Sequence, residues 1–144
     1  MLLGFSVGAY AGYAYGSYLY FNNGGYSYES RSFIYTGSGP GLFLPVIAYT
    51  SVGSTTASIP AGYEGAQAWA YQMNSTNSYT LVGYSMWYYN DSAMPINNKY
   101  IVSYEFYSIK GPSFVSYGYS QTYNSASGFY TQYRPNQSPA ETVM

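Results

Sequence analysis

The chain has 144 residues, of which 23 are Tyr and 16 are Gly; only 6% are charged, and His and Cys are absent. Four basic residues are too few for the cationic surface that nucleic-acid binding needs, and a chain without His or Cys cannot build the usual zinc, haem or Ser-His-Asp sites. We therefore expect no enzymatic activity, no cofactor, no metal and no nucleic-acid partner.

Apolar and polar residues alternate along most of the chain, with clusters of Gly, Pro, Asn and Ser between the alternating segments. This pattern is typical of β-strands joined by turns. It predicts strands at 3–21, 26–36, 42–51, 66–73, 79–89, 100–109, 113–123 and 128–133. Strands of this number and spacing predict an all-β chain, namely a single β-sandwich of immunoglobulin-like or jelly-roll type with an extended N-terminal donor strand.

The predicted organisation has three parts. Residues 1–21 form the N-terminal strand, residues 22–133 the sandwich body, and residues 134–144 a loose C-terminal tail, because Pro135 and Pro139 stand there among polar residues.

The first predicted strand has an unusual composition. Its odd-numbered positions form an apolar row, Leu3, Phe5, Val7, Ala9, Ala11, Tyr13 and Tyr15, and its even-numbered positions are mostly Gly, Ser or Ala. Fully extended, residues 3–21 would reach roughly 60 Å, whereas ordinary strands have about 3 to 10 residues. No charge precedes Glu29 and no proline precedes Pro40, so the usual protection of an edge strand is missing. These features favour a donor strand that enters a neighbouring subunit, while an ordinary first strand bent at Gly12 or Gly16 remains the alternative.

Three Asn-X-Ser/Thr triplets, at Asn74, Asn90 and Asn136, lie in predicted loops. Such triplets accept N-linked glycans in secreted proteins, so we expect an extracellular glycoprotein; unmodified turns are the alternative. No run of 18 apolar residues is present, and we expect no membrane insertion. Residues 1–21 lack a basic start, which favours retained structure over a cleaved signal peptide.

Two further patterns suggest other functions. The strands contain three groups of aromatic residues. Exposed aromatic residues can stack on sugar rings, but such residues more often form core contacts and cross-strand pairs, which is the favoured interpretation. The three groups are Tyr84, Trp87, Tyr88 and Tyr89; Tyr104, Phe106 and Tyr107; and Tyr117 and Tyr119. Glu64 and Glu105 are a weak candidate for the acid pair of a glycosidase, and Asp91 among asparagines is a weak candidate for a calcium ligand.

The alternating segment from Leu3 to Phe21, the low-charge body rich in Tyr, Ser and Asn, and the three triplets together resemble subunits of archaeal extracellular filaments built by donor-strand complementation, of the thread-filament or bundling-pilin type. The resemblance implies a β-sandwich pilin, head-to-tail self-assembly through the N-terminal strand and dense surface glycosylation.

The leading hypothesis is therefore a cell-surface filament subunit that serves adhesion or biofilm cohesion, whose partner is another copy of itself. A viral capsid or tail protein with a jelly-roll body and a glycan-binding adhesin domain are the alternatives.

Overall fold

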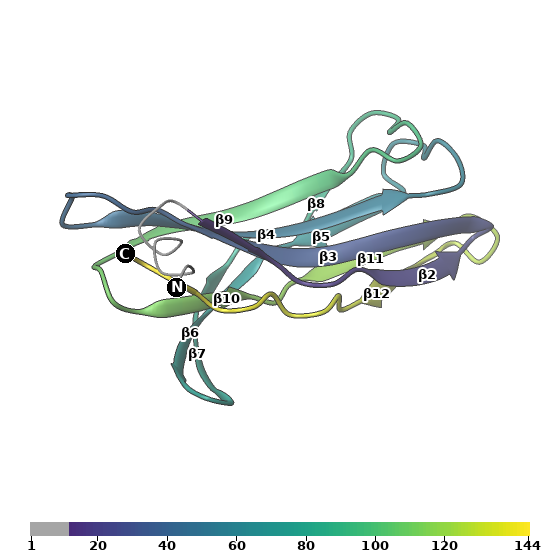
Figure 1. The fold of residues 1–144 in the computed structure, drawn as a ribbon. Helices are drawn as coiled ribbons and strands as arrows, with labels where there is room; N and C mark the ends of the chain where they lie inside the picture. Colours follow the sequence, from purple (N-terminus) through teal and green to yellow (C-terminus); the bar gives the residue numbers. More distant parts are fainter. Residues whose placement is uncertain (1–11) are drawn as a thin grey trace, which may run out of the picture.

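The computed structural model describes residues 12–144, and this part of the chain contains strands and turns but no helix. All pairs of neighbouring strands are antiparallel. The predicted all-β class is confirmed for these residues, and the strands lie in two layers (Figure 1). Consequently, residues 12–144 hold no helix with the length and apolarity needed to cross a membrane.

The first layer is one sheet built around two long central strands. It contains β1 (Gly12–Tyr15), β2 (Leu19–Asn23), β3 (Tyr26–Thr36), β4 (Leu44–Ser54) and β9 (Tyr100–Ser108). β4 lies between β3 and β9, while β1 and β2 both pair with the other side of β3. Period-two alternation directs the even-numbered residues of β3 and β4, such as Ile34 and Val46, into the core.

The N-terminal part of this sheet differs from the prediction of one strand over residues 3–21. Within the described residues, the strand is interrupted at residues 16–18, so that β1 and β2 follow one another along β3. The Gly16 N–H donates to the Ser32 carbonyl oxygen at 2.9 Å. A Cβ atom at Gly16 would lie 2.7 Å from the Asn136 carbonyl oxygen, so only glycine fits at this crossing.

The second layer consists of two four-stranded sheets placed end to end. One has the order β13-β10-β6-β7 and the other the order β12-β11-β5-β8. The strands are β5 (Glu64–Gln67), β6 (Trp69–Ser75), β7 (Ser78–Tyr84), β8 (Tyr88–Tyr89), β10 (Ser113–Ser116), β11 (Tyr119–Asn124), β12 (Phe129–Tyr133) and β13 (Glu141–Thr142). Each sheet takes one strand from each of four stretches of chain, namely 64–75, 78–89, 113–124 and 129–142. The β6–β7 hairpin projects from the body (Figure 1).

The break between these two sheets lies over a polar centre of the core. The Gly118 N–H donates to the buried Ser32 Oγ at 3.0 Å. A Cβ atom at Gly118 would overlap Thr50 Oγ1 and the Gln67 carbonyl oxygen, so the two layers approach most closely where a side chain is missing.

Two apolar clusters fill the core on either side of this centre. The first cluster joins the first layer to the β13-β10-β6-β7 sheet and contains Ile34, Leu44, Val46, Ala48, Ala70, Phe114 and Val143. The second cluster joins it to the β12-β11-β5-β8 sheet and contains Tyr28, Val52, Ile59, Ala66 and Val102. β3 and β4 contribute to both, and they connect the two halves into one body.

The C-terminal residues are not the loose tail that their prolines predicted. Glu141 and Thr142 form β13 and pair with β10. The next residue, Val143, is only 1% exposed and belongs to the first cluster. The tail is anchored because its apolar residue reaches the core, an outcome that depends on tertiary packing and not on local composition.

Candidate assembly site

The predicted donor strand divides between residues inside and outside the described part of the chain. Leu3, Phe5, Val7, Ala9 and Ala11 lie outside the described residues. Tyr13 and Tyr15 lie in β1, where they pair with Tyr35 and Phe33 of the same molecule. The Tyr13 ring is 4.9 Å from the Tyr35 ring, and the Tyr15 ring is 5.1 Å from the Phe33 ring. These two tyrosines are therefore part of the molecule's own sheet.

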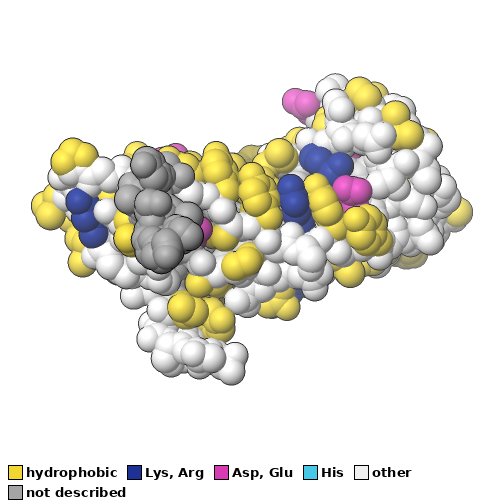
Figure 2. Space-filling view, viewed as in Figure 1, with side chains coloured by type: hydrophobic (Ala, Val, Ile, Leu, Met, Phe, Trp, Pro, Cys, Tyr) yellow, Lys and Arg dark blue, Asp and Glu magenta, His cyan; other side chains and the backbone are white. Residues whose placement is uncertain are grey.

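Assembly by strand addition also requires an open sheet edge that can accept a strand. Among the described residues, β9 forms one edge of the first layer, while β7 and β8 form one edge of the second layer. Figure 2 shows few charged side chains on the visible face, so charge offers little protection against association there.

β7 is the longest of these edge strands that carries no charged residue. It pairs with β6 on one side, and all its residues except Gly83 are exposed. Tyr79, Leu81, Val82 and Tyr84 are its exposed large apolar residues. Residues 65–90 contain neither a charged residue nor a proline, whereas the β9 edge carries Glu105. Sequence reasoning placed a strand here but did not identify it as an edge, although this long uncharged stretch was a signal that could have done so.

Two of the three glycosylation triplets present their asparagine on the surface. Asn74 is exposed near the β6–β7 turn, and its Nδ2 donates to Thr80 Oγ1 at 2.7 Å. Asn136 is exposed as well, and its Nδ2 donates to the carbonyl oxygen and hydroxyl of Ser17. Each side chain is held by contacts at the surface, from which it can rotate away without opening the core.

Asn90 has a different environment, which does not suit the predicted glycan. It is 2% exposed, its Nδ2 donates to the carbonyl oxygens of Pro60 and Ser92, and its Oδ1 accepts from the Glu64 N–H. A glycan on Nδ2 would require the loss of these hydrogen bonds, so the amide has a structural role.

The aromatic groups serve mainly as packing contacts. Tyr84 stacks on Trp69 at 4.4 Å, and the Tyr89 hydroxyl donates to Gln121 Oε1. Tyr104 and Phe106 pack against the first cluster. Trp87 stacks on Tyr89 at 6.2 Å, Tyr88 and Tyr107 are exposed, and Tyr117 and Tyr119 lie against Arg134.

The acidic residues do not form the pair considered from the sequence. Glu64 is buried on the inner face of β5, whereas Glu105 is exposed on β9 and Asp91 is exposed in a loop. Burial raises the pKa of the Glu64 carboxyl to about 8, and the Lys99 ammonium lowers it in part. Among residues 12–144, no three His, Cys, Asp or Glu side chains gather as metal ligands would.

No protein-family model, no curated protein and no solved structure matches the chain.

Proposed function

We propose that the chain is a structural subunit of an extracellular filament, in which the N-terminal segment of one copy adds a strand to an exposed edge of the next. The observation that carries this proposal is the open and uncharged edge of β7. An edge strand leaves alternate N–H and C=O groups unpaired, and natural proteins normally protect such edges with charge or proline. A protein that keeps such an edge exposed is suited to assembly.

The sequence of residues 3–11 fits the role of the added strand. One row of its side chains is apolar and includes Leu3, Phe5 and Val7, while the other is mostly Gly and Ser. The bare row permits close approach to another backbone, and the apolar row can cover Leu81 and Tyr79 of the acceptor. Since Tyr13 and Tyr15 are in the subunit's own sheet, the proposed donor segment ends at Ala11.

The body of the proposed subunit is an immunoglobulin-like sandwich. For this comparison, β5 with β6, β7 with β8, β10 with β11 and β12 with β13 each count as one strand, and the count starts at β3. The first layer then has its strands in the order first, second and fifth, and the second layer has the order fourth, third, sixth and seventh. The immunoglobulin fold has the same two-sheet arrangement except that its fourth strand lies in the other sheet, whereas a jelly roll interleaves its strands differently. β1 and β2 extend the first layer ahead of β3.

An extracellular, glycosylated filament is the setting that we propose for this subunit, with adhesion or biofilm cohesion as its role. Glycans at the exposed Asn74 and Asn136 would supply the surface solvation that the few charges do not provide. Intact mass of the native protein tests this point: we expect sugar increments at Asn74 and Asn136 and none at Asn90.

Two variants of the full chain test the assembly itself. Val7→Asp places a charge in the donor row and leaves β7 intact, while Leu81→Lys places a charge on the acceptor edge and leaves the donor intact. We expect wild-type filaments in negative-stain images and monomers for each variant alone. An equal mixture should form heterodimers only, because one variant can accept and the other can donate.

Leu42→Lys is the matched control, since Leu42 is an exposed leucine outside the strands. This variant should polymerise as the wild type does. Filaments formed by either Val7→Asp or Leu81→Lys alone would contradict the proposal.

A further inference from the structure

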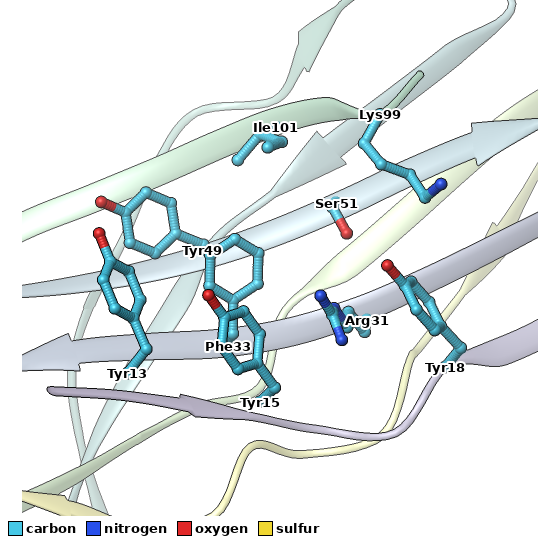
Figure 3. Close-up of a pocket in the computed structure, with 9 residues that line it drawn as sticks. All are labelled: Tyr13, Tyr15, Tyr18, Arg31, Phe33, Tyr49, Ser51, Lys99 and Ile101. Carbon is cyan, nitrogen blue, oxygen red and sulfur yellow. The ribbon is translucent and has the colours of Figure 1, made fainter. Parts of the chain in front are cut away.

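A groove on the outer face of the first layer has unused polar groups between aromatic walls (Figure 3). Its volume is about 380 Å³, and it is open to solvent. The groove is lined by Tyr13, Tyr15, Tyr18, Arg31, Phe33, Tyr49, Ser51, Lys99 and Ile101. These residues come from β1, β3, β4 and β9 and from the segments beside them, so the register of the sheet creates the groove.

Stacked rings form one side of the groove. The Phe33 ring lies 4.6 Å from the Tyr49 ring with an angle of 9° between the planes, and the Tyr15 ring lies 5.1 Å from the Phe33 ring. Tyr13 and Tyr15 are each about half exposed. Aromatic faces carry partial negative charge and attract the partly positive C–H groups of a sugar ring.

Arg31 lies at the centre of the groove between two tyrosines. Its guanidinium carbon is 4.4 Å from the Tyr15 ring centroid and 4.3 Å from the Tyr18 centroid. Stacking of this kind covers the faces of a guanidinium group and leaves the in-plane N–H donors for a ligand.

Two polar atoms in the groove lack partners. The Nε of Arg31 and the Oγ of Ser51 are buried, and neither has a hydrogen-bond partner among residues 12–144. Arg31 and Ser51 are direct cross-strand neighbours, and Figure 3 shows the Ser51 hydroxyl between the Arg31 and Lys99 side chains. Both atoms are buried from solvent, so the donors that a ligand in the groove can reach are the terminal guanidinium nitrogens of Arg31, which make no hydrogen bond within residues 12–144.

Arg134 is stacked between aromatic rings in the same way, and its Nε likewise lacks a partner within residues 12–144, but one of its terminal nitrogens is used inside the protein. Its guanidinium carbon is 3.6 Å from the Tyr117 ring centroid and 4.4 Å from the Tyr119 centroid. One of its terminal nitrogens donates to the Tyr71 hydroxyl at 3.0 Å and to the Tyr117 carbonyl oxygen at 3.1 Å. Arg134 therefore joins strands, whereas Glu29, two residues before Arg31 on β3, pairs with Lys99 at 3.3 Å.

The charge of the groove selects the ligand. Arg31 and Lys99 are basic, Glu29 neutralises one of them, and none of the residues from 12–144 that line the groove is acidic. A carboxylate is the complementary group, since it accepts two parallel hydrogen bonds from a guanidinium.

We propose that this groove binds an acidic polysaccharide, with a uronic-acid ring stacked on Tyr15 and Tyr13 and its carboxylate bound by the terminal nitrogens of Arg31. The open shape suits a chain that continues past the site, and repetition of the site along a filament would add avidity. The inference concerns the subunit surface and holds whether or not the proposed filament forms.

Calorimetric titration of the full chain with trigalacturonic acid tests the proposal, with its uncharged methyl ester as the second probe. We expect the acid to bind roughly tenfold or more tightly than the ester, and Arg31→Gln and Tyr15→Ala each to weaken acid binding by a similar factor. Arg134→Gln is the control, and it should leave the affinity unchanged while lowering the melting temperature.

Three results would overturn the proposal. They are equal binding of acid and ester, acid binding that is unchanged in Arg31→Gln, and the absence of binding to either probe. Loss of self-association in Arg31→Gln without oligosaccharide binding would instead assign the groove to another copy of the chain.

Discussion

The two clusters of the core share β3 and β4, but a buried carboxyl group lies beside only one of them. The first cluster, which includes Ile34 and Phe114, contains apolar side chains only. Beside the second cluster, Glu64 is fully buried next to Ala66 on the inner face of β5, and neither of its carboxyl oxygens has a hydrogen-bond partner among the described residues. The comparison places the buried carboxyl, and the pH dependence that it causes, in one half of the molecule.

The sign of that dependence follows from the pKa of Glu64. Burial raises the pKa to about 8 in the folded protein, against 4.5 for the exposed group. Below about pH 4.5 the carboxyl is protonated in both states and its contribution to stability is fully present. Between 4.5 and 8 unfolding releases a proton, so the free energy of unfolding falls as the pH rises, and the loss is complete above the folded pKa. Glu64 thus makes a larger contribution to stability at acidic pH than at neutral pH.

Glu64→Gln should produce the largest effect, because it removes the titration and keeps the shape of the side chain. At about 1.4 kcal/mol per pKa unit, the wild-type free energy of unfolding should fall by up to about 5 kcal/mol between pH 4.5 and pH 8. The variant should lose that slope. Urea denaturation at a series of pH values measures both curves, and parallel curves would contradict this assignment.

Phe114→Ala should affect the first cluster by a comparable amount but without pH dependence. Phe114 is buried and meets Phe106 edge-on at 5.0 Å. Its removal leaves a cavity that should cost about 3 to 5 kcal/mol. The same denaturation series should show a curve displaced downward by a constant amount, and a displacement that varies with pH would mean that the two clusters are coupled.

A matched pair of small deletions compares the apolar parts of the clusters directly. Ile34 and Ile59 are both fully buried, one in each cluster. Ile34→Val and Ile59→Val should each cost about 0.5 to 1.5 kcal/mol at every pH. If Ile59→Val also changed the pH at which stability is lost, the environment of Glu64 would depend on apolar packing as well as on its own burial.

The sequence predicted the positions of most strands because their signal is local, although the predicted single strands 66–73, 79–89 and 113–123 each divide into two. β3 and β9 match the predicted segments 26–36 and 100–109 within a residue, since alternation and turn residues define them. The break after β1 and the anchoring of Val143 depend on contacts between distant segments, such as Gly16 with Asn136, and no local pattern reports them.

The candidate sites were less predictable for the same reason. Asn90 has an acceptor triplet, but its burial follows from its hydrogen bond to Glu64 on another strand. The groove around Arg31 is created by strand register, which brings Ser51 opposite Arg31. Of the proposed assembly site, the sequence predicted the donor row but not which edge would receive it.

Lys99→Gln should have the smallest effect, and it tests whether the Lys99 charge limits the rise in the pKa of Glu64. Lys99 lowers the pKa of Glu64, so its removal should raise that pKa and move the end of the stability loss to higher pH. The ion pair with Glu29 is near the surface, and its loss should cost less than about 1 kcal/mol below pH 4.5. Lys110→Gln is the control because Lys110 is exposed, and it should leave the denaturation curve in place. Equal shifts of the denaturation curve along the pH axis in both variants would indicate a general effect of net charge. A shift in Lys99→Gln alone would assign the interaction to this lysine, and the pH response would then arise within the half of the core that holds Glu64.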